Sequence, residues 1–311
     1  MSDHHDGRRF FHPWPFRGQG AADVARFMAA WFTKRGAGAW IDRRHEDLAG
    51  PPPPERADAR VTFINHASFL LQIDGLNLLT DPVYSERCAP TQFAGPRRFR
   101  PPGVRFEDLP PIDAVLLSHN HYDHLDVPTL KRLRARFDAP IIAPLGHRAV
   151  VDRHRLGDLV ELDWWGEHRI GELVVTLCPA QHFSGRGAFD RDRSLWGSFW
   201  VQGRRSVYFG ADSGMGPHFA MIRQRLGAPD LALLGVGAFR PREFMRPVHM
   251  APEEAVEAAR ILEAGLWIPH HYGTFPLGLD GMTEAADLLE AQHQEGDPPL
   301  LRLQEGAAWE G

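Results

Sequence analysis

Cysteine is scarce in this chain of 311 residues, which has only Cys88 and Cys178. Two cysteines cannot build a disulfide framework, so we expect no disulfide-stapled secreted domain. Long apolar runs are also missing, and no stretch approaches the roughly 20 residues that a membrane-spanning helix needs. The segment Met1–Gly20 carries charge, histidine and proline but no apolar signal-peptide core. We therefore expect a cytoplasmic protein, with peripheral contact to a membrane surface left open.

Lysine is nearly absent as well, since Lys34 and Lys131 are the only two and arginine supplies the other positive charges. We attribute this excess of arginine to coding bias. The formal net charge of −5 argues against a nucleic-acid binder driven by bulk charge. With 43% hydrophobic and 24% charged residues, the composition is that of an ordinary globular protein that can bury a large core.

Residues 1–59 are predicted to form an N-terminal extension. Phe10–Phe16 is aromatic and rich in proline, hence irregular. Ala21–Arg35 has the spacing of an amphipathic helix, whose apolar stripe we expect to pack on the main domain rather than in a membrane. Gly50–Pro54 is a stiff, proline-rich linker. Residues 60–311 are predicted to form the second, catalytic domain.

The catalytic domain opens with β-strands and continues with strands and helices mixed. Asp74-Gly75 is a strong hairpin signal between the first antiparallel strands. Apolar or β-branched runs predict strands at Val61–Ile64, Phe69–Ile73, Leu76–Thr80, Ala114–Leu117, Ile141–Ala143, Leu173–Leu177, Ser206–Phe209, Leu231–Val236 and Leu266–Pro269. Helices are predicted at Thr129–Phe137 and Pro252–Ala264. Mixed sheets with interspersed helices indicate a layered α/β domain.

The strongest chemical motif follows the strand at Ala114–Leu117. It reads His119-Asn-His121-Tyr-Asp123-His124, so one short loop offers ligands to two neighbouring metal centres. Imidazole and carboxylate together suit Zn²⁺, with iron or manganese as alternatives. A lone His-x-His would be weak in a chain with 17 histidines, but the full set at the end of an apolar strand is much more specific.

Two catalytic zinc ions need more ligands than this loop supplies. His182, Asp212 and His271 each lie just beyond a predicted strand end, where open α/β sheets place their sites. His270 is the main rival of its neighbour, and we favour His271 because it begins the run His-Tyr-Gly-Thr-Phe275.

These residues resemble the metallo-β-lactamase fold superfamily. The resemblance implies an αββα sandwich with two metal ions at one edge of the two sheets, and the ligand types favour zinc for both ions. It implies that His119, His121 and His182 hold one metal, that Asp123, His124 and His271 hold the other, and that Asp212 bridges them.

The match is closer to the N-acylphosphatidylethanolamine-hydrolysing phospholipase D family. The segments that resemble this family are Phe11–Pro15, Asn65–Ala67, Leu79–Pro82, Gly95–Arg100, Pro110–Val115, Glu161–Trp165 and Leu195–Ser198. The resemblance implies a metal-dependent phosphodiesterase that acts on N-acylated phospholipids.

Water held between two divalent cations has a lowered pKa, so a hydroxide is available as the nucleophile without any serine or cysteine. Asp123 and His249 are the predicted catalytic residues. His249 could protonate a leaving group or hold a phosphate oxygen, or it could be a structural residue at a helix entry. The predicted substrate-binding residues are Arg97, Arg98, Arg100 and Tyr122. Stacking of nucleic-acid bases is an alternative for the arginine segment, and a solvated loop with its aromatic side chains folded inward is the interpretation that we slightly favour.

Three other functions compete with the phosphodiesterase. A lactonase or other small-molecule hydrolase could use the same core, and substrate panels would separate the two. A nuclease ranks low because the chain is acidic and has no spare insertion of domain size. A non-catalytic, metal-bearing regulatory protein is disfavoured because a structural zinc needs only one closed tetrahedron of ligands.

Overall fold

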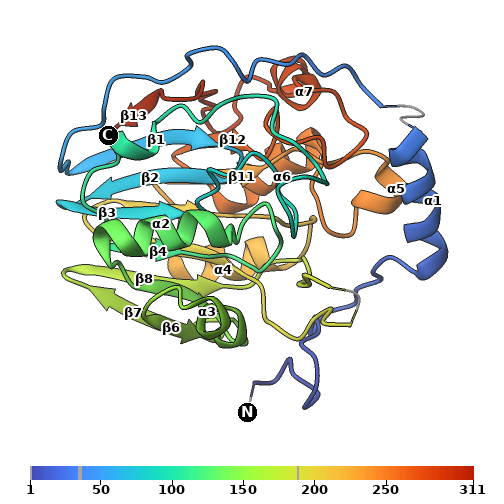
Figure 1. The fold of residues 1–311 in the computed structure, drawn as a ribbon, viewed down its shortest axis with the longest axis horizontal. Coiled ribbons are helices and arrows are strands. Elements are labelled where there is room, and N and C mark those ends of the chain that lie inside the picture. Colours follow the sequence, from blue (N-terminus) through green and yellow to red (C-terminus); the bar gives the residue numbers. More distant parts are fainter. Residues whose placement is uncertain (1, 34–36, 188) are drawn as a thin grey trace.

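Two mixed β-sheets lie face to face in the computed structural model, which describes residues 2–33, 37–187 and 189–311 (Figure 1). The first sheet has the strand order β13-β1-β2-β3-β4-β5-β6. Its strands are β1 (Ala59–Asn65), β2 (Ser68–Ile73), β3 (Leu76–Thr80), β4 (Ala114–Leu116), β5 (Ile141–Pro144), β6 (Leu159–Leu162) and β13 (Ala308–Glu310). The pairs from β13 to β3 are antiparallel, and those from β3 to β6 are parallel.

The second sheet has the order β12-β11-β10-β9-β8-β7. Its strands are β7 (Glu167–Ile170), β8 (Leu173–Cys178), β9 (Ser198–Gln202), β10 (Ser206–Phe209), β11 (Leu231–Gly235) and β12 (Leu266–His270). The β10, β11 and β12 strands are parallel, while β7 to β10 pair antiparallel. Consequently β8, β10, β11 and β12 all run in one direction.

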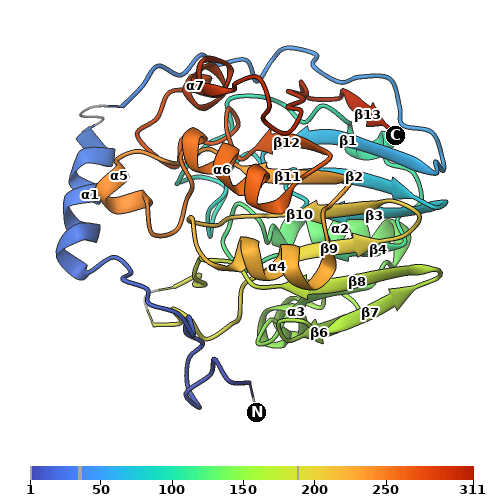
Figure 2. The ribbon, with the colours of Figure 1, turned by 180° about the vertical axis from the view of Figure 1, so that it is seen from behind.

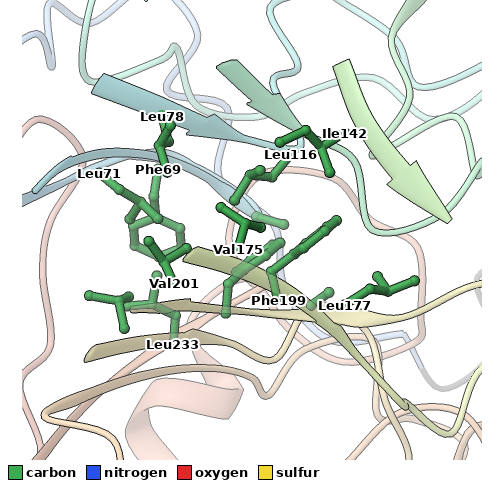
Figure 3. Close-up of a cluster of buried hydrophobic side chains, with 14 of the residues drawn as sticks. Phe69, Leu71, Leu78, Leu116, Ile142, Val175, Leu177, Phe199, Val201 and Leu233 are labelled. Atoms are coloured by element: carbon green, nitrogen blue, oxygen red, sulfur yellow. The ribbon is translucent and has the colours of Figure 1, made fainter. Parts of the chain in front are cut away.

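The space between the sheets is filled by alternate side chains of both. Figure 3 shows Phe69, Leu71 and Leu116 of the first sheet facing side chains from strands of the second, Val175, Leu177, Phe199, Val201 and Leu233. All of these are buried. Since side chains alternate across a strand, the intervening residues face outwards and require cover from helices.

Helices supply that cover on both outer faces. The first sheet is covered by α2 (Val127–Phe137) and α3 (Arg148–His154), whose Leu130, Leu133 and Val151 pack on its outward residues (Figure 1). The second sheet is covered by α4 (His218–Leu226) and α6 (Pro252–Leu262), which lie in front of it in Figure 2, while α7 (Glu284–Gln292) lies at the top of that view and packs on α6. Short helices occur at α5 (Arg242–Met245) and, as a 3₁₀ turn, η1 (Phe106–Asp108).

The expected αββα sandwich is therefore confirmed, and each strand predicted from the sequence is present within two residues of its expected ends. The Asp74-Gly75 hairpin has positive φ at both residues, 50° and 77°. The sequence did not predict the strands β6, β7, β9 and β13. The edge strand β7 reads Glu-His-Arg-Ile and is only partly buried, so its sequence lacks the apolar run by which the others were recognised.

The N-terminal residues wrap one side of the sandwich. The predicted helix is present as α1 (Ala21–Thr33), and its last two expected residues, Lys34 and Arg35, lie outside the described part of the chain. Phe27 stacks on Phe244 of α5 with ring centroids 4.5 Å apart. Val24 and Met28 of the same stripe remain about two-fifths exposed, at 40% and 39%. The predicted division of the chain after residue 59 stays a prediction.

Within the described residues, no helix combines the length and apolar character that crossing a bilayer would demand.

Candidate metal centre

Six strands end at one rim of the sandwich, and each is followed by a histidine or an aspartate. In the first sheet β1, β3 and β4 run the same way and lead into His66, Asp81 and His119. In the second sheet β8, β10 and β12 lead into His182, Asp212 and His271. Parallel chain direction thus brings side chains from distant parts of the sequence to the same rim.

Three of these residues have an unusual backbone conformation, which determines the direction of their side chains. His66, Asp81 and His271 have positive φ of 49°, 34° and 68°. Non-glycine residues in this region cost free energy, and they are held here by tertiary contacts such as the 2.9 Å bond from the His271 amide to the His66 carbonyl. The backbone at Gly237 can lie against His271 only because glycine has no side chain. A Cβ at Gly237 would lie 1.8 Å from the carbonyl oxygen of His271.

One cluster of ring nitrogens is formed by His119, His121 and His182. His119 Nε2 lies 2.8 Å from His121 Nδ1, and His182 Nε2 lies 3.2 Å from the same atom. The chain turns directly after His121, since its carbonyl accepts the amides of His124 and Leu125. That turn separates the motif into two halves, as the spacing of the motif predicts.

A second cluster contains Asp123, His124, His271 and also His66. Asp123 Oδ2 lies 3.3 Å from the Nε2 atoms of both His124 and His271. His66 Nε2 lies 3.1 Å from the same oxygen. All four residues are buried.

Asp212 lies between the two clusters. Its Oδ2 is 3.1 Å from His124 Nε2 of the second cluster and 3.7 Å from His182 Nε2 of the first. Its Oδ1 is 3.1 Å from His271 Nε2. The structure therefore brings together all seven residues predicted as ligands, in the two groups that the resemblance implies; their role as ligands stays a prediction.

Hydrogen bonds on the far side of three rings fix their orientation. His124 Nδ1 lies 2.7 Å from Asp81 Oδ2, His182 Nδ1 lies 3.0 Å from the Val248 carbonyl, and His119 Nδ1 lies 2.9 Å from Ser118 Oγ. Ser118 itself donates to Asp81. With the outer nitrogens engaged in this way, the inner nitrogens point at one another, which is the arrangement found around metal ions in proteins.

Burial and neighbouring charge have opposite effects on the pKa values of the two aspartates in the clusters. Burial would raise the pKa of Asp123 and of Asp212, but neighbouring His124 holds both well below their usual range. Burial lowers the pKa of His119 and His182 well below its usual value. Carboxylates and imidazoles that converge in a buried place are the donor set of a divalent cation, so the residues present fit a metal site.

His249 also reaches this site, from the segment just before α6. Its ring lies 5.2 Å from that of His182 and 5.3 Å from that of His271, and it groups with His182 and Asp212. Burial lowers its pKa to about 4. The predicted catalytic histidine is thus adjacent to both clusters.

The predicted substrate-binding residues are dispersed. Tyr122 borders the clusters, and its hydroxyl donates to the Arg186 carbonyl at 3.0 Å. Arg98 is buried and donates to the carbonyls of Val83, Ser85 and Arg100, while Arg97 is paired with Glu86 at 3.3 Å.

Arg100 is buried too, in an ion pair with Glu305 at 2.9 Å. The guanidinium groups of Arg98 and Arg100 are therefore engaged by partners within the protein.

Two residues of the centre were not singled out from the sequence. His66 and Asp81 lie in two of the segments that resemble the family, and each follows a strand end, but neither was predicted as a site residue because each stands alone without a second ligand nearby in sequence. His270, the rival of His271, instead lies among the rings of Phe69 and Phe209, at 5.6 and 5.5 Å.

Comparison with known proteins shows the family to which this chain belongs. Residues 76–272 match the profile of the beta-lactamase superfamily domain. The chain is 35% identical over 268 residues to N-acyl-phosphatidylethanolamine-hydrolyzing phospholipase D 1 of Caenorhabditis elegans, covering 80% of this chain and 75% of that protein. It is 32% identical over 238 residues to the mitochondrial enzyme of the same name in Saccharomyces cerevisiae, covering 74% of this chain and 50% of that protein.

Among solved structures, the fold is similar to that of Igni18, a metallo hydrolase from Ignicoccus hospitalis. The TM-score is 0.60 at 22% identity, over 81% of this chain and 98% of that one. At this identity the likeness concerns the fold alone.

Proposed function

This chain belongs to the metallo-β-lactamase superfamily and to its N-acylphosphatidylethanolamine-hydrolysing branch, and on that premise we propose that it is a phospholipase D-type phosphodiesterase. It is a metal-dependent hydrolase by its family and by its buried imidazole and carboxylate clusters. The proposal adds the substrate class, N-acylphosphatidylethanolamine-like phospholipids, and a pair of divalent cations, with zinc favoured by the donor set.

The observation that carries the proposal is the position of Asp212 between two imidazole clusters. His119, His121 and His182 would hold one cation, Asp123, His124 and His271 the other, and Asp212 contacts both groups at 3.1 to 3.9 Å. Two cations so held would lower the pKa of a bound water and offset charge on a phosphoryl oxygen. No serine or cysteine nucleophile is required.

His249 is proposed as the residue that serves the leaving group. It lies beside both clusters, and nearby acidic groups are already engaged with His124 and His271. A ring N–H at this place can donate to a phosphoryl oxygen or to the departing alkoxide. Asp123 is proposed to act through the second cluster, where it fixes the rings of His124 and His271.

A cavity of about 570 Å³ has Tyr122 in its wall, and its basic side chains, Lys131, Arg153 and Arg186, outnumber its acidic ones, Asp126 and Asp190. Its size and this excess of basic groups support binding of an anionic lipid headgroup beside Tyr122. Of the arginines predicted from the sequence, only Arg97 has an exposed guanidinium, so Tyr122 and Arg97 are the two that the proposal retains.

The test is a lipid assay with zinc-loaded protein. Vesicles of N-acylphosphatidylethanolamine should yield phosphatidic acid and N-acylethanolamine in equal amounts, since water adds across one phosphorus–oxygen bond. A chelator should abolish the release and added zinc should restore it. The Asp123→Ala variant, run with the same lipids and with a panel of lactones, serves as the inactive control. Intact lipid with metal-loaded protein, or cleavage of lactones only, would refute the proposal.

A further inference from the structure

The N-terminal strap, residues 10–16, crosses the rim beside the metal clusters. Figure 1 shows the N-terminal segment passing near the loop that follows β8. Two bonds hold it in place. The Phe10 amide donates to the Asp192 carbonyl at 2.8 Å, and Trp14 Nε1 donates to Gln181 Oε1 at 3.1 Å. The strap is therefore a fixed wall of the site, not a loose tail.

Beneath the strap lies a cavity of about 190 Å³. Its walls are mostly aromatic, and both the strap and the catalytic domain contribute to them: Phe10, His12, Phe16, His182, Phe183 and Trp196. Within the wall the His12 ring packs against Phe16 at 3.9 Å and against Trp196 at 4.9 Å. The cavity is thus a small aromatic compartment that the strap completes.

This compartment adjoins the first cluster directly. Phe183 follows His182 in the chain, and its ring lies 4.5 Å from His121 and 4.9 Å from His182. A group that enters the compartment beside Phe183 would therefore lie next to His121 and His182.

Two charged residues, Arg191 and Asp192, border the compartment and form an ion pair with each other. The Arg191 guanidinium lies over the Phe183 ring at 4.2 Å, and its Nε is 3.5 Å from Asp192 Oδ2, so the two charges offset each other. Burial, with a contribution from His4, lowers the pKa of His12 to about 3, so that ring is uncharged near neutral pH. Aromatic walls without net charge favour an apolar guest over an ion.

We propose that this aromatic compartment binds the N-acyl chain of the substrate, and that residues 10–16 set the preferred length of that chain. The inference rests on the proposed function, whose substrate has one acyl chain on nitrogen and two on glycerol. A compartment of about 190 Å³ suits part of a single chain and is too small for two chains side by side.

Binding of the product tests the compartment without any catalytic turnover. The probes are N-acylethanolamines with two to eight acyl carbons, titrated into zinc-loaded protein and followed by calorimetry. Each methylene that enters an apolar site tightens binding by about fourfold, so affinity should rise with chain length until the compartment is full.

The matched variants are Phe16→Trp and Phe32→Trp. Phe16→Trp fills the compartment and should remove the dependence on chain length, whereas Phe32 is 70% exposed on α1 and its replacement should change nothing. Thermal unfolding confirms that each variant folds. Phe16→Ala should have the opposite effect, because it enlarges the compartment. Its affinity for the probes should go on rising at chain lengths where the affinity of the wild type no longer increases.

The same variants in the lipid assay separate the two proposals. With glycerol chains held constant, Phe16→Ala should shift the N-acyl length that gives the highest kcat/KM, and with the N-acyl chain constant it should leave the preference for glycerol chains unchanged. A dependence on chain length that is the same as in the wild type in both Phe16→Trp and Phe16→Ala overturns the compartment. Wild-type protein that binds the probes but cleaves no phospholipid refutes the proposed function and leaves the compartment as an apolar binding site.

Discussion

Asp81 and His124 are joined by a buried hydrogen bond of 2.7 Å between Oδ2 and Nδ1, which fixes the ring whose other nitrogen faces both Asp123 and Asp212. Burial works against the positive charge on His124, but the three carboxylates of Asp212, Asp123 and Asp81 together raise its pKa well above the usual value. When a cation replaces that proton, Asp81 still determines which nitrogen is offered to it.

Replacement of Asp81 by asparagine should weaken metal binding by about 10- to 100-fold, because the amide cannot reproduce the charged acceptor that orients His124. Competition with a chromophoric chelator measures the affinity. Asp47→Asn is the matched control, since Asp47 is an exposed partner of Arg105. Equal affinities in both variants would show that Asp81 does not position the ligand.

His249→Ala should lower kcat by about 10²- to 10⁴-fold while metal content stays at the wild-type level, since the ring adjoins both clusters and His249 is not among the seven proposed ligands. Metal analysis and turnover are measured on the same sample, with His45→Ala, at an exposed position, as the control. Unchanged turnover would assign His249 a structural role.

The buried ion pair of Arg100 and Glu305 is expected to stabilise the fold rather than bind substrate. Glu305→Gln leaves the Arg100 guanidinium buried without a counter-charge, which should cost about 3–5 kcal/mol of unfolding free energy. Denaturant unfolding provides the measurement. Glu310→Gln, which removes an exposed partner of Arg60, should cost no more than about 1 kcal/mol. Similar losses in the two variants would contradict the structural role.

Acid should destabilise the protein partly through His218, which is buried and bonded through Nε2 to Ser213 Oγ at 3.0 Å. Burial, with a smaller effect of His12, lowers its pKa from 6.5 to about 3. The unfolded chain therefore binds a proton below about pH 6.5 that the folded chain refuses, so the stabilising contribution is complete above that pH and is lost as pH falls towards 3.

Between pH 7 and pH 5 this single group should remove about 2 kcal/mol of unfolding free energy. The loss over that interval should be smaller by this amount in His218→Asn than in the wild type, as measured by denaturant titration. His45→Asn, at an exposed position, should retain the full loss. An equal acid dependence in His218→Asn and the wild type would refute the assignment.

Much of this architecture could be predicted because local sequence determines it. Apolar runs such as Leu231–Gly235 are buried on both faces and can form only interior strands. The motif from His119 to His124 contains its ligands within six consecutive residues, so no tertiary information is needed to recognise it. His182, Asp212 and His271 followed from the general rule that active sites form beyond strand ends.

Other features depend on contacts between distant residues. Arg98 looks like a surface arginine in sequence, yet three backbone carbonyls surround its guanidinium. Asp81 is one carboxylate among many until the fold brings His124 to it. The strap over Phe183 pairs residues about 170 positions apart, and no local pattern encodes that distance. Such relationships become visible only once the two sheets are assembled.

The most direct test of the account is metal stoichiometry, measured by elemental analysis of zinc-saturated protein after removal of loosely bound ions. Two ions per chain are predicted for the wild type. Asp212→Ala should bind markedly less because it removes the one carboxylate shared by the clusters, while Asp47→Ala, at the exposed partner of Arg105, should still bind two. A wild-type chain that binds one ion or none at saturation, or an Asp212→Ala variant that keeps both with unchanged affinity, would contradict a shared two-metal centre.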